Sequence, residues 1–182
     1  KWRNLRVLGV HARSKLWAAE TSDRRYHLHK LREELNNQWN AGPALLLGDF
    51  NAEPFSDEIV SAADLGACRE RREIVCHKFS GLHTLPLYNP TWCLLKDAET
   101  DHEPAGTFYF QDQSRGVQWQ CIDQVMASWE LAASWKPTWN PILLPALSCH
   151  NTLTNGRPQK TLSDHVPLMV NLSLQEVKEC QI

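Results

Sequence analysis

Six polar side chains stand at or beside the ends of apolar, strand-like segments: His11, Asp49, Asn51, Asp123, Asp164 and His165. Loops at strand ends, held by a rigid sheet, are where catalytic groups concentrate. Carboxylate and amide oxygens can bind a divalent cation, which in turn can activate a water and neutralise charge on a phosphate. A histidine paired with a carboxylate is a suitable donor to a phosphate oxygen. The set therefore indicates metal-assisted chemistry at a phosphoester.

Taken singly, most of these residues also have a purely structural interpretation. Asp49 and Asn51 are turn formers that can make an Asx-turn after a strand, and Asp164 can cap nearby loop backbone. An isolated histidine is more often packed and hydrogen-bonded than catalytic, and this holds for His11 and for His165. Asp123 is different, because a carboxylate inside an apolar strand needs a partner if it is buried.

The elements that must position these side chains follow from the apolar spacing. A strand is predicted over 5–11, a helix over 22–40 and a short buried strand over 44–47. The helix has Ser22 as its candidate N-cap and ends before Gly42. Its apolar residues recur at helical spacing and form one stripe: Leu28, Leu31, Leu35 and Trp39.

Shorter elements are predicted in the rest of the chain. A helix is expected over 56–63, two strands over 107–110 and 118–127, and a closing strand over 166–174. Residues 68–104 show no regular pattern. The order of helices and strands indicates layers of helices packed on sheets.

Four motifs follow one another along the chain: Val10-His11 with Ser14-Lys15, Gly48-Asp49-Phe50-Asn51, Ile122-Asp123-Gln124-Val125, and Ser163-Asp164-His165-Val166-Pro167-Leu168. In type, order and spacing they resemble the motifs of the endonuclease/exonuclease/phosphatase family, which has the DNase I-like fold. Bacterial members are also matched by Asn89-Pro90-Thr91-Trp92 and Gly106-Thr107-Phe108-Tyr109. The resemblance implies an α+β fold, a four-layer αββα sandwich, as a single domain over 1–182. It also implies hydrolysis of phosphoester bonds that depends on Mg²⁺ or Mn²⁺.

The same resemblance implies a role for each motif residue. Asp49 would orient or deprotonate the attacking water, and Asn51 would hold that water or a phosphate oxygen. His165 would hydrogen-bond the scissile phosphate and stabilise its transition state, with Asp164 positioning the imidazole. Asp123 would orient the site and anchor neighbouring polar groups.

Further roles implied by the family concern the phosphate and the metal. His11 would assist at the phosphate or the leaving group, and Ser14 is a candidate phosphate contact. Asp49 and Asp164 are the implied metal ligands. The family's main ligand, however, is a glutamate on a strand that precedes the His11 strand, and here only ten residues precede His11. The fold is therefore expected to lack its N-terminal third, and to need a missing N-terminal segment or a partner chain.

A second glutamate motif occurs near the C-terminus. Leu174-Gln175-Glu176-Val177 reads like the family's glutamate motif, but it follows the predicted closing strand. We interpret it as coincidence. The alternative is a permuted site that uses Glu176, and mutation of that residue would decide between the two.

Composition limits the class of protein. The 182 residues are 42% hydrophobic and 22% charged, which is typical of a globular domain. The net charge of −2 excludes a protein that coats nucleic acid by charge alone. No apolar run is long enough to span a membrane. The leading hypothesis is a phosphodiesterase acting on nucleic acid. The alternatives are a phosphomonoesterase or lipid phosphodiesterase of the same fold, and a non-catalytic phosphate-binding fragment.

Cysteine usage and the N-terminus bear on the cellular compartment. The six cysteines form no C-x-x-C pair and are expected to be mostly reduced thiols. No signal peptide is visible, which favours a cytoplasmic location. The chain opens at Lys1 without a methionine, so the natural N-terminus is expected to be absent.

Overall fold

We describe the protein from a computed structural model. The residues that the structure describes are 5–14, 21–37, 42–76, 86–100, 103–111, 116–144, 146–147, 150–151, 153–159 and 161–173. Lys1, Lys15, Trp39 and the motif Leu174-Gln175-Glu176-Val177, all discussed above, lie outside these ranges. Their expected roles stay predictions.

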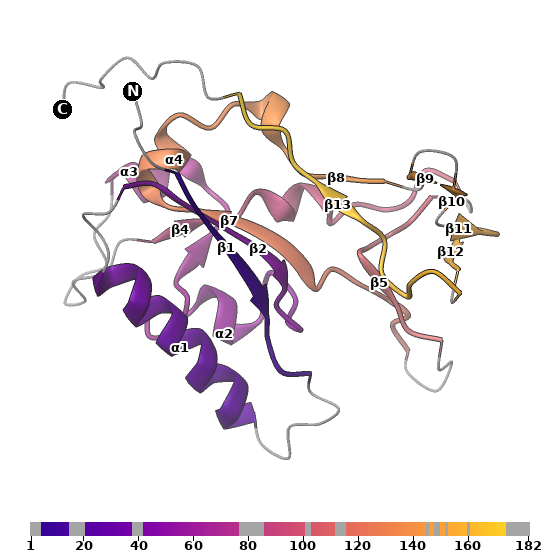
Figure 1. Cartoon of the computed structure of the whole chain (residues 1–182), viewed down its shortest axis with the longest axis horizontal. Coiled ribbons are helices and arrows are strands. Elements are labelled where there is room, and N and C mark those ends of the chain that lie inside the picture. Colours follow the sequence, from indigo (N-terminus) through magenta and orange to yellow (C-terminus); the bar gives the residue numbers. More distant parts are fainter. Residues whose placement is uncertain are drawn as a thin grey trace.

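A five-stranded mixed sheet forms the centre of the described structure (Figure 1). Its strands, in spatial order, are β1 (Arg6–His11), β2 (Ala44–Asp49), β7 (Asp123–Ala127), β4 (Leu87–Tyr88) and β3 (Ala67–Cys68). β1 runs parallel to β2, whereas β7 runs antiparallel to both of its neighbours, β2 and β4. The strands predicted over 5–11 and 44–47 are therefore confirmed, and the structure shows that they are neighbours.

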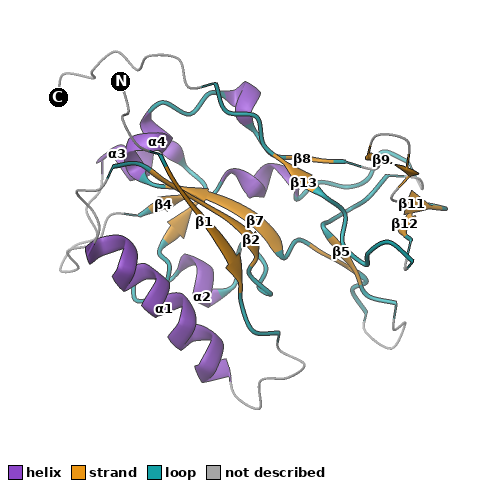
Figure 2. Ribbon diagram, in the orientation of Figure 1, coloured by secondary structure: helices purple, strands orange, loops and turns teal. Residues whose placement is uncertain are grey.

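One face of this sheet is covered by α1 (Thr21–Asn37) and α2 (Asp57–Val60), as Figures 1 and 2 show. Leu28 and Leu35 of the predicted stripe are buried against Leu46 of β2. Burial of such side chains contributes about 1.5–3 kcal/mol each, so this interface is a main source of stability. It holds α1 and β2 in a fixed relation, and both elements supply residues near the site.

The observed helices differ from the predicted ones at their ends. α1 begins at Thr21, so Ser22 lies inside the helix and the predicted N-cap at this residue is wrong. α2 spans Asp57–Val60 and is shorter than predicted, although Ser56 does occupy its N-cap position. Helix ends depend on capping and packing, which single-sequence patterns define poorly.

The opposite face of the sheet is covered less evenly. α4 (Trp129–Ala133) and the 3₁₀ helix η3 (Pro137–Trp139) lie over its centre. A second buried cluster forms there: Leu45, Val125, Ala127, Leu131, Trp135 and Trp139. Towards the β1 edge, Val7 remains 60% exposed and Leu47 38% exposed.

The remaining strands form short pairs beside the main sheet. They are β5 (Phe108–Tyr109) with β6 (Trp119–Gln120), β8 (Ile142–Leu143) with β13 (Leu168–Met169), β9 (Ala146–Leu147) with β10 (His150–Asn151), and β11 (Leu153–Thr154) with β12 (Arg157–Pro158). Two further helices complete the described elements, α3 (Arg71–Cys76) and the 3₁₀ helix η2 (Pro90–Leu94). The architecture mixes helices and strands as expected, but the described residues form only one large sheet.

Two of the predicted strands are reorganised. The strand predicted over 118–127 is two strands, because β6 pairs with β5 whereas β7 pairs with β2. The chain passes from one sheet to the other at Cys121 and Ile122. The predicted closing strand over 166–174 is regular only at β13.

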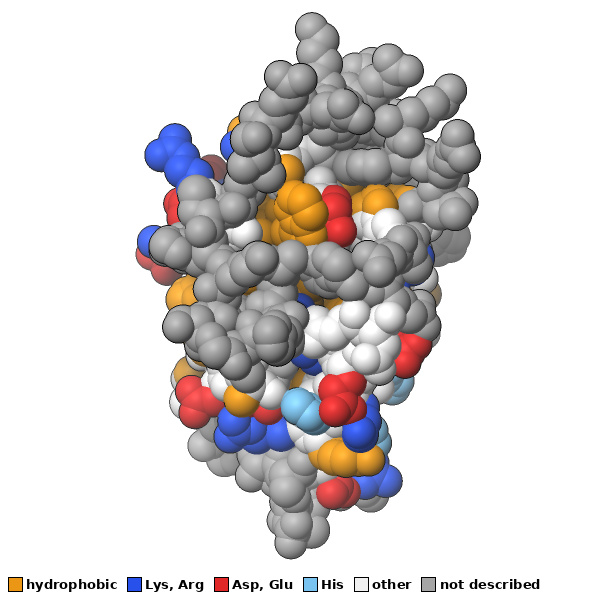
Figure 3. Space-filling view, turned by 90° about the vertical axis from the view of Figure 1, so that its left-hand side faces the viewer, with side chains coloured by type: hydrophobic (Ala, Val, Ile, Leu, Met, Phe, Trp, Pro, Cys, Tyr) orange, Lys and Arg blue, Asp and Glu red, His pale blue; other side chains and the backbone are white. Residues whose placement is uncertain are grey.

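The surface around α1 is mixed in charge. Acidic and basic side chains are interspersed on the side of the molecule that Figure 3 presents. Ion pairs join Lys30 to Glu33 at 2.5 Å and Arg25 to Asp64 at 2.6 Å. The Lys30–Glu33 pair is exposed and screened by water and salt, whereas Asp64 of the second pair is buried. Among the described residues, no helix has both the length and the apolar character needed to cross a membrane.

Candidate active site

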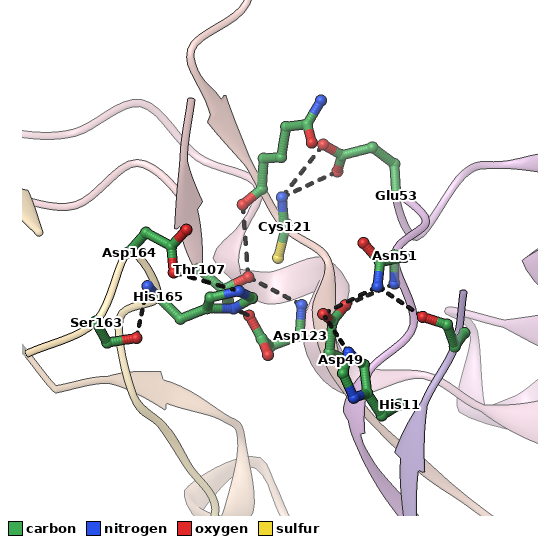
Figure 4. Close-up of polar contacts among 12 residues, drawn as sticks. His11, Asp49, Asn51, Glu53, Thr107, Cys121, Asp123, Ser163, Asp164 and His165 are labelled. Atoms are coloured by element: carbon green, nitrogen blue, oxygen red, sulfur yellow. Dashed lines mark hydrogen bonds and ion pairs between the residues drawn. The ribbon is translucent and has the colours of Figure 1, made fainter. Parts of the chain in front are cut away.

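Three of the predicted site residues lie side by side at one edge of the main sheet. In the strand register His11 is opposite Asp49, and Asp49 is opposite Asp123. Directly opposed residues project from the same face of a sheet, so their side chains are neighbours (Figure 4). His11 and Asp49 end β1 and β2, whereas Asp123 begins β7. The antiparallel course of β7 therefore brings its first residue to the edge where the other two strands end.

Gly48 allows β1 and β2 to approach closely just before the site. A Cβ atom at this position would lie 2.1 Å from the carbonyl oxygen of Val10, and the backbone φ is +137°. Both features exclude a larger residue without movement of the strands. Close packing of β1 against β2 therefore explains why the Gly48-Asp49-Phe50-Asn51 motif begins with glycine.

Asp49 is held in place by the turn that follows it. Both oxygens of its carboxylate accept hydrogen bonds from Asn51, at 2.7 Å from the backbone N–H and 3.0 Å from the side-chain Nδ2. Nδ2 of Asn51 also donates to the carbonyl oxygen of Ala12, at 2.7 Å. Because a carbonyl must face a donor, this contact fixes the orientation of the Asn51 amide. The Asx-turn predicted as the structural interpretation of Asp49 and Asn51 is therefore present, and it orients the Asp49 carboxylate.

The environment of Asp49 disfavours its ionised form. Burial raises the pKa of the Asp49 carboxyl, and the nearby negative charge of Asp123 acts in the same direction. The hydrogen bond from the Asn51 backbone acts in the opposite direction, as does the charge on His165. Carboxylates with raised pKa in a cleft are candidate proton acceptors and cation ligands.

His165 is oriented by Asp123. Nδ1 of the imidazole lies 2.7 Å from Oδ2 of Asp123, and this contact raises the pKa of His165 against the opposing effect of burial. When the ring is neutral, Nδ1 carries the proton and Nε2 is an acceptor. When the ring is protonated, Nε2 becomes a donor. The raised pKa favours the second state, which suits a phosphate oxygen.

Asp164 contacts His165 less closely than Asp123 does, and its implied positioning role stays a prediction. Its side chain is 58% exposed, and its Oδ1 lies 3.9 Å from Nε2 of His165. The carboxylate within hydrogen-bond distance of the imidazole is that of Asp123. Figure 4 places Asp164 on the far side of His165 from Asp49, so the two implied metal ligands are not neighbours.

Backbone contacts to β5 hold the Asp164-His165 segment. Tyr109 N–H donates to the Asp164 carbonyl at 3.3 Å, and Val166 N–H donates to the Thr107 carbonyl at 2.7 Å. Oγ1 of Thr107 accepts a hydrogen bond from the Asp123 backbone at 2.9 Å. Thr107 therefore links the His165 segment to the start of β7.

Several supporting residues were not singled out from the sequence. Thr107 occurs in the Gly106-Thr107-Phe108-Tyr109 string, which was the available signal for it. The ring of Phe108 lies 4.9 Å from that of His165 and limits where the imidazole can move. Glu53 accepts from the Cys121 backbone with both oxygens, at 3.2 Å. Local spacing carries no signal for that contact.

Other predicted groups lie at the margin. The side chain of His11 is 85% exposed, with Nε2 3.9 Å from Oδ2 of Asp49. Ser14 follows the end of β1 and is half-buried, and its contact with a phosphate stays a prediction. Burial raises the pKa of the Cys121 thiol to about 12, so this thiol stays protonated and is unsuited to nucleophilic chemistry.

The fit of a divalent metal can be tested on this arrangement. Asp49 and Asp123 supply two adjacent carboxylates, and each oxygen of Asp49 accepts one hydrogen bond and keeps a further lone pair for a cation. No group of three or more metal-ligating side chains occurs within the described part of the chain. The described residues alone therefore do not complete a metal site.

The chain matches a known family over most of its length. A model of the Endonuclease/Exonuclease/phosphatase family matches residues 3–165, so the chain belongs to that family. The match includes the main sheet and each of the residues grouped at its edge. Phosphoester hydrolysis is the kind of activity found in this family. A search of curated proteins finds no match.

Solved structures also show similarity. A conserved protein of unknown function from Enterococcus faecalis V583 is 21% identical with a TM-score of 0.49, and the match covers 92% of this chain and 49% of that one. An endonuclease/exonuclease/phosphatase from Bacteroides vulgatus is 19% identical with a TM-score of 0.35, with 82% and 45% covered. The chain thus spans about half the length of these solved structures.

Proposed function

We propose that the protein is a phosphodiesterase that hydrolyses nucleic acid with Mg²⁺ or Mn²⁺. The observation that carries the proposal is the grouping of Asp49, Asp123 and His165 at one sheet edge, with the His165 imidazole held by Asp123. A proton acceptor and an oriented phosphate donor are the two groups that water attack on a phosphoester requires.

The proposed division of labour follows from the environment of each side chain. Asp49 orients the attacking water and accepts its proton, a role that fits its raised pKa. Protonated His165 donates from Nε2 to a phosphate oxygen, because Nδ1 is already occupied by Asp123. Asn51 holds the Asp49 carboxylate in place for this role by donating from its side-chain amide. His11 at the end of β1 and Ser14 in the loop that follows are the groups we expect to assist at the phosphate.

The metal would neutralise charge that develops on the phosphoryl group. We include Asp49 as one ligand, together with an acidic ligand from outside the described residues. The four-layer αββα sandwich belongs to the same proposal, because one large sheet is described here and the family's fold has two. A partner segment that adds the second sheet would also cover the exposed side chains of Val7 and Leu47.

Nucleic acid is favoured over a phosphomonoester by the aromatic side chains beside the imidazole. The ring of Phe108 lies 4.9 Å from His165 and 5.4 Å from Phe110. Aromatic surfaces beside a phosphate site can stack on bases or pack against sugars. A phosphomonoesterase or lipid phosphodiesterase remains the second candidate, since the polar residues contact the phosphate alone.

The experiment compares plasmid DNA, RNA, abasic duplex DNA and a phosphomonoester, each with Mg²⁺, with Mn²⁺ and with EDTA. Asp49→Ala and His165→Ala are expected to abolish cleavage while the far-UV circular dichroism stays native. Asp97→Ala and His29→Ala, at exposed positions away from the sheet edge, serve as matched controls and should keep full activity. Cleavage that survives Asp49→Ala or persists in EDTA would contradict the proposal.

A further inference from the structure

The turn that carries Asn51 is held from two sides by buried polar side chains. The carbonyl of Asn51 accepts from Nη1 of Arg24 on α1 at 3.3 Å. The carbonyl of Ala52 accepts from Nε2 of Gln124 on β7 at 2.5 Å. Arg24 is 1% exposed and Gln124 is fully buried. Two consecutive carbonyls thus receive their hydrogen bonds from different elements.

Each of these donors is itself fixed by a buried partner. Nη2 of Arg24 donates to Oε1 of Glu58 on α2, and Glu58 is 6% exposed. Nδ2 of Asn89 donates to Oε1 of Gln124 at 2.7 Å, which leaves Nε2 of Gln124 facing Ala52. These buried partners therefore orient Arg24 and Gln124 towards the turn.

The conformation of this turn places its donors on Asp49. Asn51 has a φ of +49°, a left-handed conformation that asparagine tolerates better than most other non-glycine residues. In this conformation the Asn51 backbone and side chain both donate to the Asp49 carboxylate. A relaxed turn would release both donors, and Asp49 would lose its orientation.

We infer that Arg24, held by Glu58, is a positioning residue for the Asn51 turn and hence for Asp49, with Gln124 as the second donor to the same turn. Stability alone is a weak reason for this ion pair. Removing two charges from water costs several kcal/mol, and apolar residues of similar volume often replace buried pairs without loss of stability. The contact that apolar residues cannot replace is the donation from Arg24 to the Asn51 carbonyl.

The test separates positioning from stability with the double variant Arg24→Met/Glu58→Met. Removing both charges leaves no buried charge unpaired, so we expect only the modest loss of thermal stability that follows from the lost donor to the Asn51 carbonyl. We expect kcat to fall about 10²-fold with KM little changed, because the turn misplaces Asp49 without altering substrate contacts. A double variant with native stability and wild-type kcat would overturn the inference. This kinetic measurement rests on the proposed function.

A second variant guards against misfolding of the first. Arg24→Lys keeps a positive charge beside Glu58, but one ammonium lacks the planar fork that serves two acceptors in fixed directions. It should fold and still lose most of its kcat. Arg32→Met is the matched control, because Arg32 is an almost equally buried arginine on α1. It should lose stability while a correctly folded fraction keeps its kcat.

Amide hydrogen exchange supplies a readout that does not depend on catalysis. The Asn51 N–H is protected by the Asp49 carboxylate, so the peptide over residues 49–53 should exchange faster in both Arg24 variants. Arg32→Met should leave that peptide unchanged relative to the rest of the sheet. If the wild type cleaves none of the substrates, the proposed function fails, and unchanged exchange in the Arg24 variants would separately overturn the positioning role.

Discussion

Nδ1 of His165 lies 2.7 Å from Oδ2 of Asp123, although the two residues belong to different motifs far apart in the sequence. The neighbouring Asp164 is further away and largely exposed. A short, half-buried contact of this kind fixes the imidazole tautomer and favours the protonated ring. The protonation state of His165 therefore depends on Asp123.

Replacing Asp123 with asparagine should lower the pKa of His165. The amide keeps an acceptor near Nδ1 but removes the negative charge that stabilises the imidazolium. Titration of the ring by NMR would measure the change, with Asp164→Asn as the control that should produce a smaller one. If Asp164→Asn lowers the pKa more than Asp123→Asn, the pairing described here is incorrect. The proposed phosphodiesterase activity should fall about 10²–10³-fold in Asp123→Asn, because the variant weakens His165 as a donor to the phosphate.

The same contact predicts how stability changes with pH. The folded-state pKa of His165 is raised above its ordinary value of 6.5, so the folded protein binds this proton more tightly than the unfolded chain does. Its contribution to stability is fully present below the unfolded pKa and is lost as pH rises through the folded pKa. Urea unfolding at a series of pH values should show this loss. Asp123→Asn should reduce it, and an unchanged profile in that variant would argue against His165 as its origin.

Gly48 and Gly9 lie on adjacent strands but should respond oppositely to alanine. A Cβ at Gly48 would meet the Val10 carbonyl at 2.1 Å, whereas a Cβ at Gly9 meets nothing within 4 Å. Gly48→Ala should cost about 1–3 kcal/mol, as for other forced close contacts. Gly9→Ala should be neutral or stabilise by about 0.5–1 kcal/mol through the lower backbone entropy of the unfolded state. Denaturant midpoints measure both, and equal costs would show that the strands are not spaced as described.

Leu46 and Leu47 test which face of β2 carries the core. Leu46 is fully buried against α1, whereas Leu47 is 38% exposed on the other face. Leu46→Ala should cost about 2–5 kcal/mol in the free energy of unfolding. Leu47→Ala should cost clearly less. The reverse order would mean that β2 presents its opposite face to the helices.

The sequence predicted the parts of the fold that depend on local spacing. The strand before His11 and the strand before Asp49 have periodic patterns and are present, and so are Leu28, Leu31 and Leu35 of the apolar stripe of α1. The break between β6 and β7 has no local signal, because it reflects which distant strand each half pairs with. The closing strand was overestimated for the same reason, since its apolar residues pack without regular pairing.

In the candidate site, too, the features with a local sequence signal were predicted and those that depend on tertiary contacts were not. Motifs identified the residue types at the sheet edge, because strand ends and polar residues are local features. The sequence did not show that Asp123 lies closer to His165 than Asp164 does. That distance depends on how β7 positions Asp123 and how β5 holds the segment with His165. Arg24 was not found either. A single arginine on a helix looks solvent-exposed until α2 and the Asn51 turn enclose it.

The alternation of side chains along β2 makes the polar edge dependent on correct strand pairing. Leu46 faces α1 and Asp49 faces the opposite side. A slip of one residue in β2 would turn Asp49 towards the helices and expose Leu46. The hydrophobic core would resist that slip, and the unpaired carboxylate would add to the penalty. The apolar residues under α1 therefore fix the strand register on which the polar residues of the other face depend. A chain that pairs its strands incorrectly loses both its hydrophobic core and its candidate site.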